Sequence, residues 1–519
     1  RVHTVADLDL LAARLAKNPY QPVPEVPGDL AGLTYDEYIN IAFRHDRGMW
    51  WTPQDQLPFW LESFHRGFVQ QDRVDLFVRE DGRNFYVPFS ADDFRYDKLL
   101  SKSSIDLKSS EIRESGHAGI KIAGKFPGGS IAEIVTFLGA SYFRARTEHT
   151  FFGSSARGLA IDAASHLPEE FPAFTCFWVQ RPREDDKALR VLALLDGPSV
   201  TGAYQFDITP GDATTTLVID AKLHARRDIK KLGIAPITSM WMWGDGLVGP
   251  AKDFRPGVHD SDGLLINTLE KGWLWRPFSR QAYPSVSQFP AGEILGFGVM
   301  QRNTAFYHYD DHNAHYERRP SIYVTPLGGD WTDGRVELFE LPGAHEGIDN
   351  IAAFWVPGET LRAGESRELQ YRLEFLWGTL KRHNQLARAT ALSIKRLDSS
   401  GENAAIGLEL RFHGAELDKL PPKANLETNL VTIRGELVGQ KVQKTDTGDW
   451  LVELRLRPTE DAPIELRVQL SRDGLPVSEE VAYLLPNKEP SFIYPDVYTR
   501  TEQTSAPPEE ESERAAARE

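Results

Sequence analysis

Hydrophobic and polar residues alternate along several stretches of this chain. The clearest examples are residues 369–375, 451–456 and 464–470, and the runs between them are rich in Gly, Pro, Asp and Asn. A period of two indicates antiparallel strands with one face in a core and the other in water. No long series with the helical period of 3.6 recurs, so an alternation of strands and helices is not expected. The predicted fold class is mainly β.

Two short helices are predicted near the N-terminus. Thr4 precedes a segment that places Leu8, Leu11 and Leu15 on one helical face. The run Thr34-Tyr35-Asp36-Glu37 has the spacing of a capping box, in which the threonine and the glutamate satisfy free backbone N–H groups at a helix start. Both helices are minor elements of a β protein.

The 519 residues are too many for one ordinary core, so more than one domain is expected. Aromatic density drops after a polar segment at 381–385, and Trp450 is the one tryptophan beyond it. We predict a large β domain over residues 1–385 and a second domain, of the size of a small β-sandwich, over residues 386–498. Residues 499–519 are charged and of low complexity, which predicts a disordered tail.

Composition excludes several classes of protein. Asp and Glu number 75 against 59 Lys and Arg, a formal charge of −16, which argues against nucleic-acid binding. No apolar stretch approaches the ~18–20 residues that cross a bilayer, so a transmembrane protein is not expected. The single cysteine, Cys176, allows neither an internal disulfide nor a zinc cluster. Phosphate-loop, dinucleotide-binding and serine-hydrolase motifs are absent, and no cofactor is expected.

Three segments combine aromatic and acidic residues in the way that carbohydrate-active proteins do. They run from 241 to 277, from 306 to 320 and from 348 to 355. Glycoside chemistry needs one carboxylic acid and one carboxylate, with rings to bind sugar faces. Asp260 and Asp262 could equally be turn formers in Asp-Ser-Asp-Gly, and Asp349 could mark a strand entry. Three histidines, at 308, 312 and 315, point in diverging directions in a strand-and-loop context, so no metal site is expected there.

Several longer motifs occur in one order along residues 20–487. They are Leu33-Thr34-Tyr35-Asp36-Glu37-Tyr38, Gly139-Ala140-Ser141-Tyr142-Phe143-Arg144-Ala145, Ser155-Ala156-Arg157-Gly158-Leu159-Ala160-Ile161-Asp162, His259-Asp260-Ser261-Asp262-Gly263-Leu264, Trp273-Leu274-Trp275-Arg276-Pro277, Arg319-Pro320-Ser321 and Asp349-Asn350-Ile351. In this order and spacing the chain resembles the OpgG/OpgD (MdoG/MdoD) family of osmoregulated periplasmic glucan biosynthesis proteins, and most resembles OpgD.

The resemblance implies a galactose-mutarotase-like β-sandwich in the N-terminal part and an immunoglobulin-like β-sandwich in the C-terminal part. It also implies a periplasmic location and action on linear β-1,2-glucan with inversion at the anomeric carbon. It leaves open a homodimer and a functional link to the inner-membrane glucan synthase.

Carried onto this sequence, the resemblance makes Asp349 the general acid and Asp260 the base. It makes Tyr316 a candidate for ordering the water between them. The residues expected to line the substrate cleft are aromatic or charged: Trp50, Tyr142, Arg144, Arg157, Trp241, Trp243, Asp262, Trp273, Trp275, Arg276 and Arg319.

Three alternatives remain at this stage. Trp241 and Trp243 stand where the family often has smaller or other apolar residues, and their rings could exclude water from the cleft. A sugar hydroxyl would then attack, and the enzyme would be a transglycosylase, which can also close glucan rings. A protein that binds glucan without catalysis, as a scaffold of the synthesis machinery, is the rival from another class. An esterase or a metal-dependent sugar isomerase is suggested by the fold type alone, which is weak ground.

Overall fold

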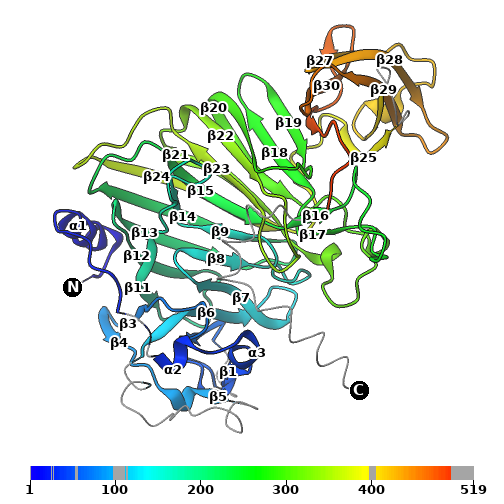
Figure 1. The fold of residues 1–519 in the computed structure, drawn as a ribbon. Coiled ribbons are helices and arrows are strands. Elements are labelled where there is room, and N and C mark those ends of the chain that lie inside the picture. Colours follow the sequence, from blue (N-terminus) through cyan, green and yellow to red (C-terminus); the bar gives the residue numbers. More distant parts are fainter. Residues whose placement is uncertain are drawn as a thin grey trace.

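The structure is a computed structural model. It describes residues 2–492 except 25, 27, 53–56, 97–111, 113–114 and 397–404. The predicted tail, residues 499–519, lies outside the described residues. Strands dominate the described chain, and the helices are short (Figure 1). The mainly β class is confirmed.

One large sheet is antiparallel throughout. In spatial order its strands are β2 (Phe59–His65), β6 (His117–Lys125), β7 (Ile131–Leu138), β8 (Tyr142–Ala145), β9 (Ser155–Arg157), β15 (Leu232–Ser239), β23 (Ile351–Val356), β22 (Thr332–Glu340) and the first part of β20 (Ser285–Met300), with β10 (Leu159–Ile161) also on β15. Of the predicted site residues, Tyr142 and Arg144 lie on β8, Arg157 lies on β9, and Asp349 lies just before β23.

A second large sheet packs against the first. Its order is β4 (Arg83–Tyr86), β3 (Asp75–Glu80), β11 (Ala173–Gln180), β12 (Leu189–Asp196), β13 (Val200–Thr209), β14 (Thr214–Ala225), β24 (Ser366–Leu376), β21 (Ser321–Gly329), the last part of β20, β18 (Gly263–Thr268) and β19 (Gly272–Pro277). Leu369, Tyr371, Leu373 and Phe375 of β24 are buried and the residues between them are not, as the alternation predicted.

The long strand β20 joins the two sheets. Residues 285–293 pair with β22 of the first sheet, and residues 294–300 pair with β18 of the second. One core of buried aliphatic and aromatic side chains fills the space between the sheets. Burying apolar surface on both inner faces is what stabilises such a pair of sheets.

The C-terminal strands form one separate sheet and one extension of the second large sheet (yellow to red in Figure 1). One holds β25 (Arg388–Arg396), β26 (Ile406–His413), β29 (Trp450–Pro458) and β28 (Gly435–Lys444); the other holds β27 (Glu427–Ile433), β30 (Ile464–Arg472), β32 (Glu480–Leu485) and the short β31 (Leu475–Pro476). The predicted boundary at 385 and 386 falls between β24 and β25. The immunoglobulin-like topology and the domain limits stay predictions.

The C-terminal strands are joined to the second large sheet. β19 pairs with β32 in parallel, through Leu274 with Glu480 and Trp275 with Val481. Beside this pairing, the guanidinium of Arg302 lies 3.6 Å from the ring centroid of Trp275.

Arg302 also bonds both carboxylate oxygens of Glu479, at 2.7 and 3.0 Å. The Glu479 side chain is fully buried and that of Arg302 is 9% exposed, and the backbone N–H of Ala389 donates to the same carboxylate at 2.8 Å. The two parts of the chain therefore share hydrogen bonds and a buried ion pair.

The remaining elements are small. α1 (Val5–Leu15) begins at the capping box of Thr4 with Asp7, and α3 (Tyr35–Tyr38) at that of Thr34 with Glu37. The others are α2 (Gly28–Ala31), the sheets β1 (Ile41–Phe43) with β5 (Phe94–Tyr96) and β16 (Trp241–Trp243) with β17 (Val258–His259), and the 3-10 turns η1 (His45–Arg47), η2 (Ala91–Asp93), η3 (Phe306–His308), η4 (Tyr316–Arg318) and η5 (Leu417–Lys419). Among the described residues, no helix has both the length and the apolar character needed to span a membrane.

Replacing Glu479 with Gln should destabilise the protein strongly, because it leaves the buried Arg302 without its counter-charge. Loss of one partner of a buried pair costs about 3–5 kcal/mol. Glu436→Gln is the control, since Glu436 pairs with Arg457 at the surface at 3.0 Å, where a pair contributes ~0–1 kcal/mol. Urea unfolding measures both. Equal losses for the two variants would contradict the buried role of Glu479.

Candidate functional site

Residues 239–241, where β15 ends and β16 begins, bond to Asp260 and to Asn350, the neighbour of Asp349. The backbone N–H of Asn350 donates to Ser239 O at 3.1 Å, and its side-chain amide exchanges two 2.8 Å hydrogen bonds with the backbone of Trp241. The backbone N–H of Asp260 donates to Met240 O at 2.8 Å. Asp260 and the residue next to Asp349 are thus bonded to three consecutive residues.

Buried hydroxyl groups brace the same segment from the β9 side. Ser154 Oγ donates to Ser239 Oγ at 2.8 Å, and Ser239 Oγ lies 2.5 Å from Ser261 Oγ. All three serines are buried. Sequence reasoning missed Ser154 and Ser239, because an isolated serine carries no pattern that separates a buried hydroxyl ladder from a surface residue.

Asp349 lies half-buried just before β23. Thr238 Oγ1, from the neighbouring strand β15, donates to its Oδ2 at 2.7 Å. The pairing of Ser239 with Ile351 fixes this register. One carboxylate oxygen of Asp349 is therefore held by the fold, and its side chain is still partly exposed.

Asp260 is buried, and burial raises the pKa of its carboxyl to about 6. Arg319, whose Nε lies 3.4 Å from Asp260 Oδ1, acts to lower this pKa. The charges of Asp349 and Glu346 raise the pKa of Asp260, and the charge of Arg144 lowers it. Asp260 and Asp349 therefore share one electrostatic neighbourhood.

Strands β8 and β9 bring three more predicted residues to this neighbourhood. The guanidinium of Arg157 lies 4.8 Å from the ring centroid of Tyr142, and Arg144 Nε donates to Ser155 Oγ at 2.6 Å. Burial raises the pKa of Tyr142, and the charges of Arg157, Asp349 and Arg144 all act on it. The charge of Asp349 thus acts on Tyr142, while Arg157, which lies beside that ring, pairs with Glu169 at 2.7 Å.

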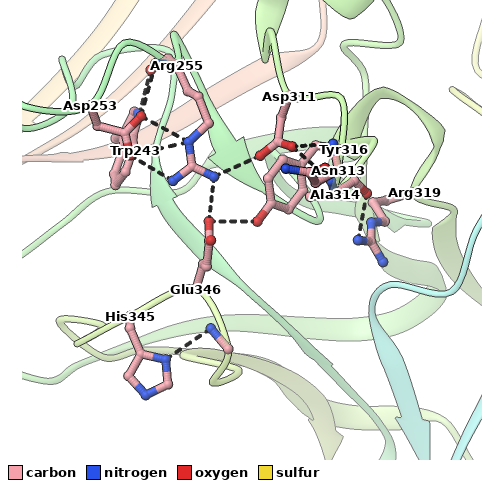
Figure 2. A network of polar contacts seen from close by, with 11 residues as sticks. Trp243, Asp253, Arg255, Asp311, Asn313, Ala314, Tyr316, Arg319, His345 and Glu346 are labelled. Carbon is pink, nitrogen blue, oxygen red and sulfur yellow. Dashed lines mark hydrogen bonds and ion pairs between the residues drawn. The ribbon is translucent and has the colours of Figure 1, made fainter. Parts of the chain in front are cut away.

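Tyr316 and Arg319 approach from η4. Tyr316 is buried, and its hydroxyl donates to Glu346 Oε2 at 3.0 Å (Figure 2). Burial raises the pKa of this phenol, with further contributions from Glu346 and Asp260. The guanidinium of Arg319 lies over the Tyr316 ring at 5.5 Å and donates to the carbonyl of Ala314 at 2.7 Å.

Glu346 is a residue of this site that sequence reasoning missed. It lies in an exposed loop, accepts from Tyr316, and forms an ion pair of 2.7 Å with Arg255. Its position three residues before Asp349 was the one signal in the sequence, but 75 acidic residues make such spacings common.

The other predicted cleft residues have partners of their own, and their role in a cleft stays a prediction. Trp50 donates to Glu80 at 2.9 Å, and Trp273 stacks on His383 with ring centroids 4.2 Å apart. Arg276 is buried and pairs with Glu340 at 2.8 Å. These side chains already have partners in the protein.

Four further predicted side chains also contact other parts of the protein. Trp243 is buried and donates its indole N–H to Arg255 O at 2.9 Å. Trp241, Asp262 and Trp275 line a separate cavity at the junction with β25. Trp241 and Trp243 are 3% and 5% exposed, and the cleft role expected for them stays a prediction.

Asp262 has a structural environment instead. Its Oδ2 accepts the backbone N–H groups of Arg302 at 2.6 Å and Asn303 at 3.1 Å. Burial raises its pKa to about 7, and the charge of Asp245 adds to the effect. Among the described residues, no group of three or more His, Cys, Asp and Glu side chains has an arrangement that could hold a metal ion.

The stability of Asp262→Asn should depend on pH. The native state keeps a proton on Asp262 up to about pH 7, which the unfolded chain releases near its ordinary pKa of 3.8, so wild-type stability falls as pH rises through this range. The variant should be more stable than wild type at pH 8 by on the order of 1–4 kcal/mol, and equal to it near pH 4. Thermal unfolding across pH measures this, with exposed Asp185→Asn as control. A gain that is the same at every pH would contradict it.

The sequence of this chain matches one family of known proteins. A family model described as periplasmic glucan biosynthesis protein, MdoG, matches residues 3–485. "Glucans biosynthesis protein G" of Ralstonia nicotianae is 39% identical over 92% of this chain and 95% of its own. "Probable glucans biosynthesis protein D" of Shewanella oneidensis is 35% identical over 88% of this chain and 84% of its own. Identity therefore does not single out the D protein, although we expected the chain to resemble it most.

Solved structures are only distantly similar. A galactose mutarotase-related enzyme from Lactobacillus acidophilus covers 46% of this chain and 95% of its own at 6% identity, with a TM-score of 0.20. A score this low supports no argument, so the mutarotase-like label stays a prediction. The match over residues 3–485 and the identities of 39% and 35% show that the chain belongs to the MdoG family of periplasmic glucan biosynthesis proteins.

Proposed function

We propose that this protein is an inverting enzyme of the periplasm that acts on linear β-1,2-glucan during glucan biosynthesis. The observation that carries the proposal is the pair Asp260 and Asp349: both segments bond to residues 239–241, and the charge of Asp349 acts on the carboxyl of Asp260. Membership of the family supports the glucan and the periplasmic location.

Asp349 is the general acid in this proposal. Its protonated oxygen gives a proton to the glycosidic oxygen as the bond from that oxygen to the anomeric carbon breaks. Thr238 holds the other oxygen, Oδ2, at 2.7 Å, which orients the carboxyl toward the substrate. Partial exposure of Asp349 leaves room for a sugar beside it.

Asp260 is the base. A pKa of about 6 leaves it mostly ionised at neutral pH, yet basic enough to take a proton from a water molecule. That water attacks the anomeric carbon from the face opposite the leaving oxygen, so the configuration inverts. Inverting enzymes need their two carboxyls about 6.5–9.5 Å apart to hold this water. The charge of Asp260 acts on the phenol of Tyr316. We assign Tyr316 the role of ordering the attacking water.

Sugar binding is assigned to the polar and aromatic groups around the pair. Arg144 is exposed, and Tyr142 with Arg157 forms a cation–π pair beside it. Guanidinium groups donate to sugar hydroxyls, and an aromatic ring offers a flat apolar face. A neutral glucan also suits a chain of net charge −16, which would repel an anionic polymer.

Hydrolysis and transglycosylation share this acid and differ in the acceptor. If a sugar hydroxyl takes the place of the water, the same proton transfers join two glucan segments or close a ring. Incubation with linear β-1,2-glucan and mass analysis of the products separates shortened chains from transferred or cyclic ones. Binding without any product would leave the noncatalytic scaffold as the function.

Asp349→Asn should lower the rate of product formation by about 10²-fold or more, because general acid catalysis contributes roughly 10²–10⁴-fold. Release of new reducing ends measures the rate, and NMR of the first product formed reports its anomeric configuration. Asp185→Asn, an exposed aspartate away from the site, should match wild type. Unchanged activity in Asp349→Asn would refute the assignment of the acid.

The pH dependence of kcat/KM should show the ionisation of the Asp260 carboxyl. Because the base must be ionised, kcat/KM should fall tenfold per pH unit below about pH 6, where the Asp260 carboxyl takes up its proton. Initial rates in buffers of constant ionic strength across the acid range measure this limb. A profile that stays flat down to pH 4 would exclude Asp260 as the base.

A further inference from the structure

A single arginine, Arg255, ties together three loops at the edge of the site. Its Nη2 lies 2.7 Å from Asp253 Oδ2, while its Nη1 donates to Asp311 Oδ2 at 2.8 Å and to Glu346 Oε2 at 2.7 Å. The side chain is 17% exposed. Figure 2 shows the guanidinium at the centre of these contacts. One cation therefore joins carboxylates from residues 253, 311 and 346.

Contacts with Asp253 and Trp243 fix the orientation of the Arg255 guanidinium, which also bonds Asp311 and Glu346. Asp253 also accepts from Arg255 Nε at 2.9 Å and from the Arg255 backbone N–H at 3.0 Å. The centroid of the Trp243 ring lies 5.7 Å from the guanidinium, and the indole N–H donates to Arg255 O at 2.9 Å. Asp253 fixes the plane of the guanidinium, and the nitrogen Nη1 bridges Asp311 and Glu346.

The Asp311 side of the bridge leads to Asp260. Asp311 Oδ1 accepts the backbone N–H groups of Asn313 and Ala314, both at 2.8 Å, and so shapes the turn before η4. The carbonyl of Ala314 accepts from Arg319 Nη2 at 2.7 Å. Arg319 then faces Asp260 through the 3.4 Å ion pair.

The Glu346 side of the bridge leads to Asp349. Glu346 precedes Asp349 by three residues and also accepts from the Tyr316 hydroxyl. Its oxygen Oε2 therefore receives two donors from two different loops. The side-chain hydrogen bonds of Arg255 go to Asp253, Asp311 and Glu346, so its effect on the two catalytic carboxyls is indirect.

We propose that Arg255 is a positioning residue of the site: by bridging Asp311 and Glu346 it sets the spacing between the segment that carries Asp349 and the turn that places Arg319 on Asp260. This inference rests on the proposed function. A misplacement of about 1 Å between reacting groups can cost about 10²-fold in rate, so a single bridge between the two sides has a large effect.

The charge of Arg255 has a second, separable consequence. Glu346 raises the pKa of Asp260, and the ion pair with Arg255 partly neutralises Glu346. Removing Arg255 should therefore raise the pKa of Asp260 further and move the acid limb of the pH profile to higher pH. Removing the charge of Glu346 should move that limb to lower pH. A role in folding alone predicts neither shift.

The test compares four variants with wild type on linear β-1,2-glucan. Arg255→Ala should lower kcat by about 10- to 100-fold, with the acid limb at higher pH. Arg255→Lys keeps the charge but loses the fork, so it should lose kcat with its acid limb near that of wild type. Glu346→Gln should show the acid limb at lower pH.

Arg226→Ala is the matched control and the fourth variant. Arg226 is also a partly buried, multiply bonded arginine, and it joins Asp196 to the carbonyls of Leu15 and Val200 beside α1. It should lose stability but keep its rate per folded molecule. The inference is overturned if Arg255→Ala keeps kcat within twofold of wild type, if Arg226→Ala loses as much, or if the acid limbs of Arg255→Ala and Glu346→Gln move in the same direction.

Hydrogen exchange separates failure of this inference from failure of the proposed function. If wild type forms no product, the proposed function fails, yet the positioning role still predicts faster amide exchange over residues 309–319 and 341–350 in Arg255→Ala than in wild type or Arg226→Ala. Unchanged exchange in those segments would overturn the role of Arg255 whatever the activity.

Discussion

The site depends on the hydrogen bonds that gather distant segments on residues 239–241. Asn350 uses its backbone N–H and both ends of its side-chain amide on Ser239 and Trp241, and Asp260 adds its own N–H to Met240. Each of these groups is buried or nearly so, where an unpaired donor or acceptor is costly. The same bonds that satisfy the backbone thus fix where two carboxyls lie. Asn350 is a structural neighbour of Asp349 in the sequence and in space, and a shorter or apolar side chain at 350 would leave Trp241 N–H and O without partners.

Unequal surroundings then distinguish the two carboxyls. Asp260 is buried with a guanidinium beside it, and its pKa is about 6. Asp349 is half-buried with a threonine hydroxyl on one oxygen. Acid–base chemistry on a glycosidic bond needs one carboxyl as acid and one as base, and we propose these roles for Asp349 and Asp260. The surrounding loops add the remaining control, since a network of Tyr316, Glu346 and Arg255 connects the two sides.

Much of the fold could be predicted from the sequence, because local patterns carry it. Period-two alternation predicted β24 and β30, and capping boxes predicted the starts of α1 and α3. The family motifs pointed to Asp260, Asp349, Tyr142, Arg144, Arg157, Tyr316 and Arg319, which the structure gathers in one region. The motif Trp273-Leu274-Trp275-Arg276-Pro277 pointed to a cleft as well, yet a sequence motif does not say whether a ring faces a ligand or a core. Trp241 and Trp243 are buried, and Arg276 is neutralised by Glu340. Glu346 and Arg255 lie on irregular loops without a period, so only the three-dimensional arrangement reveals them.

The parallel pairing of β19 with β32 limits how this protein can evolve. Many multidomain proteins exchange their domains as cassettes, because a flexible linker places few structural demands on the domain attached to it. Here a replacement for the C-terminal strands would need a strand in register with Leu274 and Trp275, together with a carboxylate in reach of Arg302. Without them, β19 would be left as an open edge prone to association. The two parts are therefore expected to be inherited together, and to change together at their shared border.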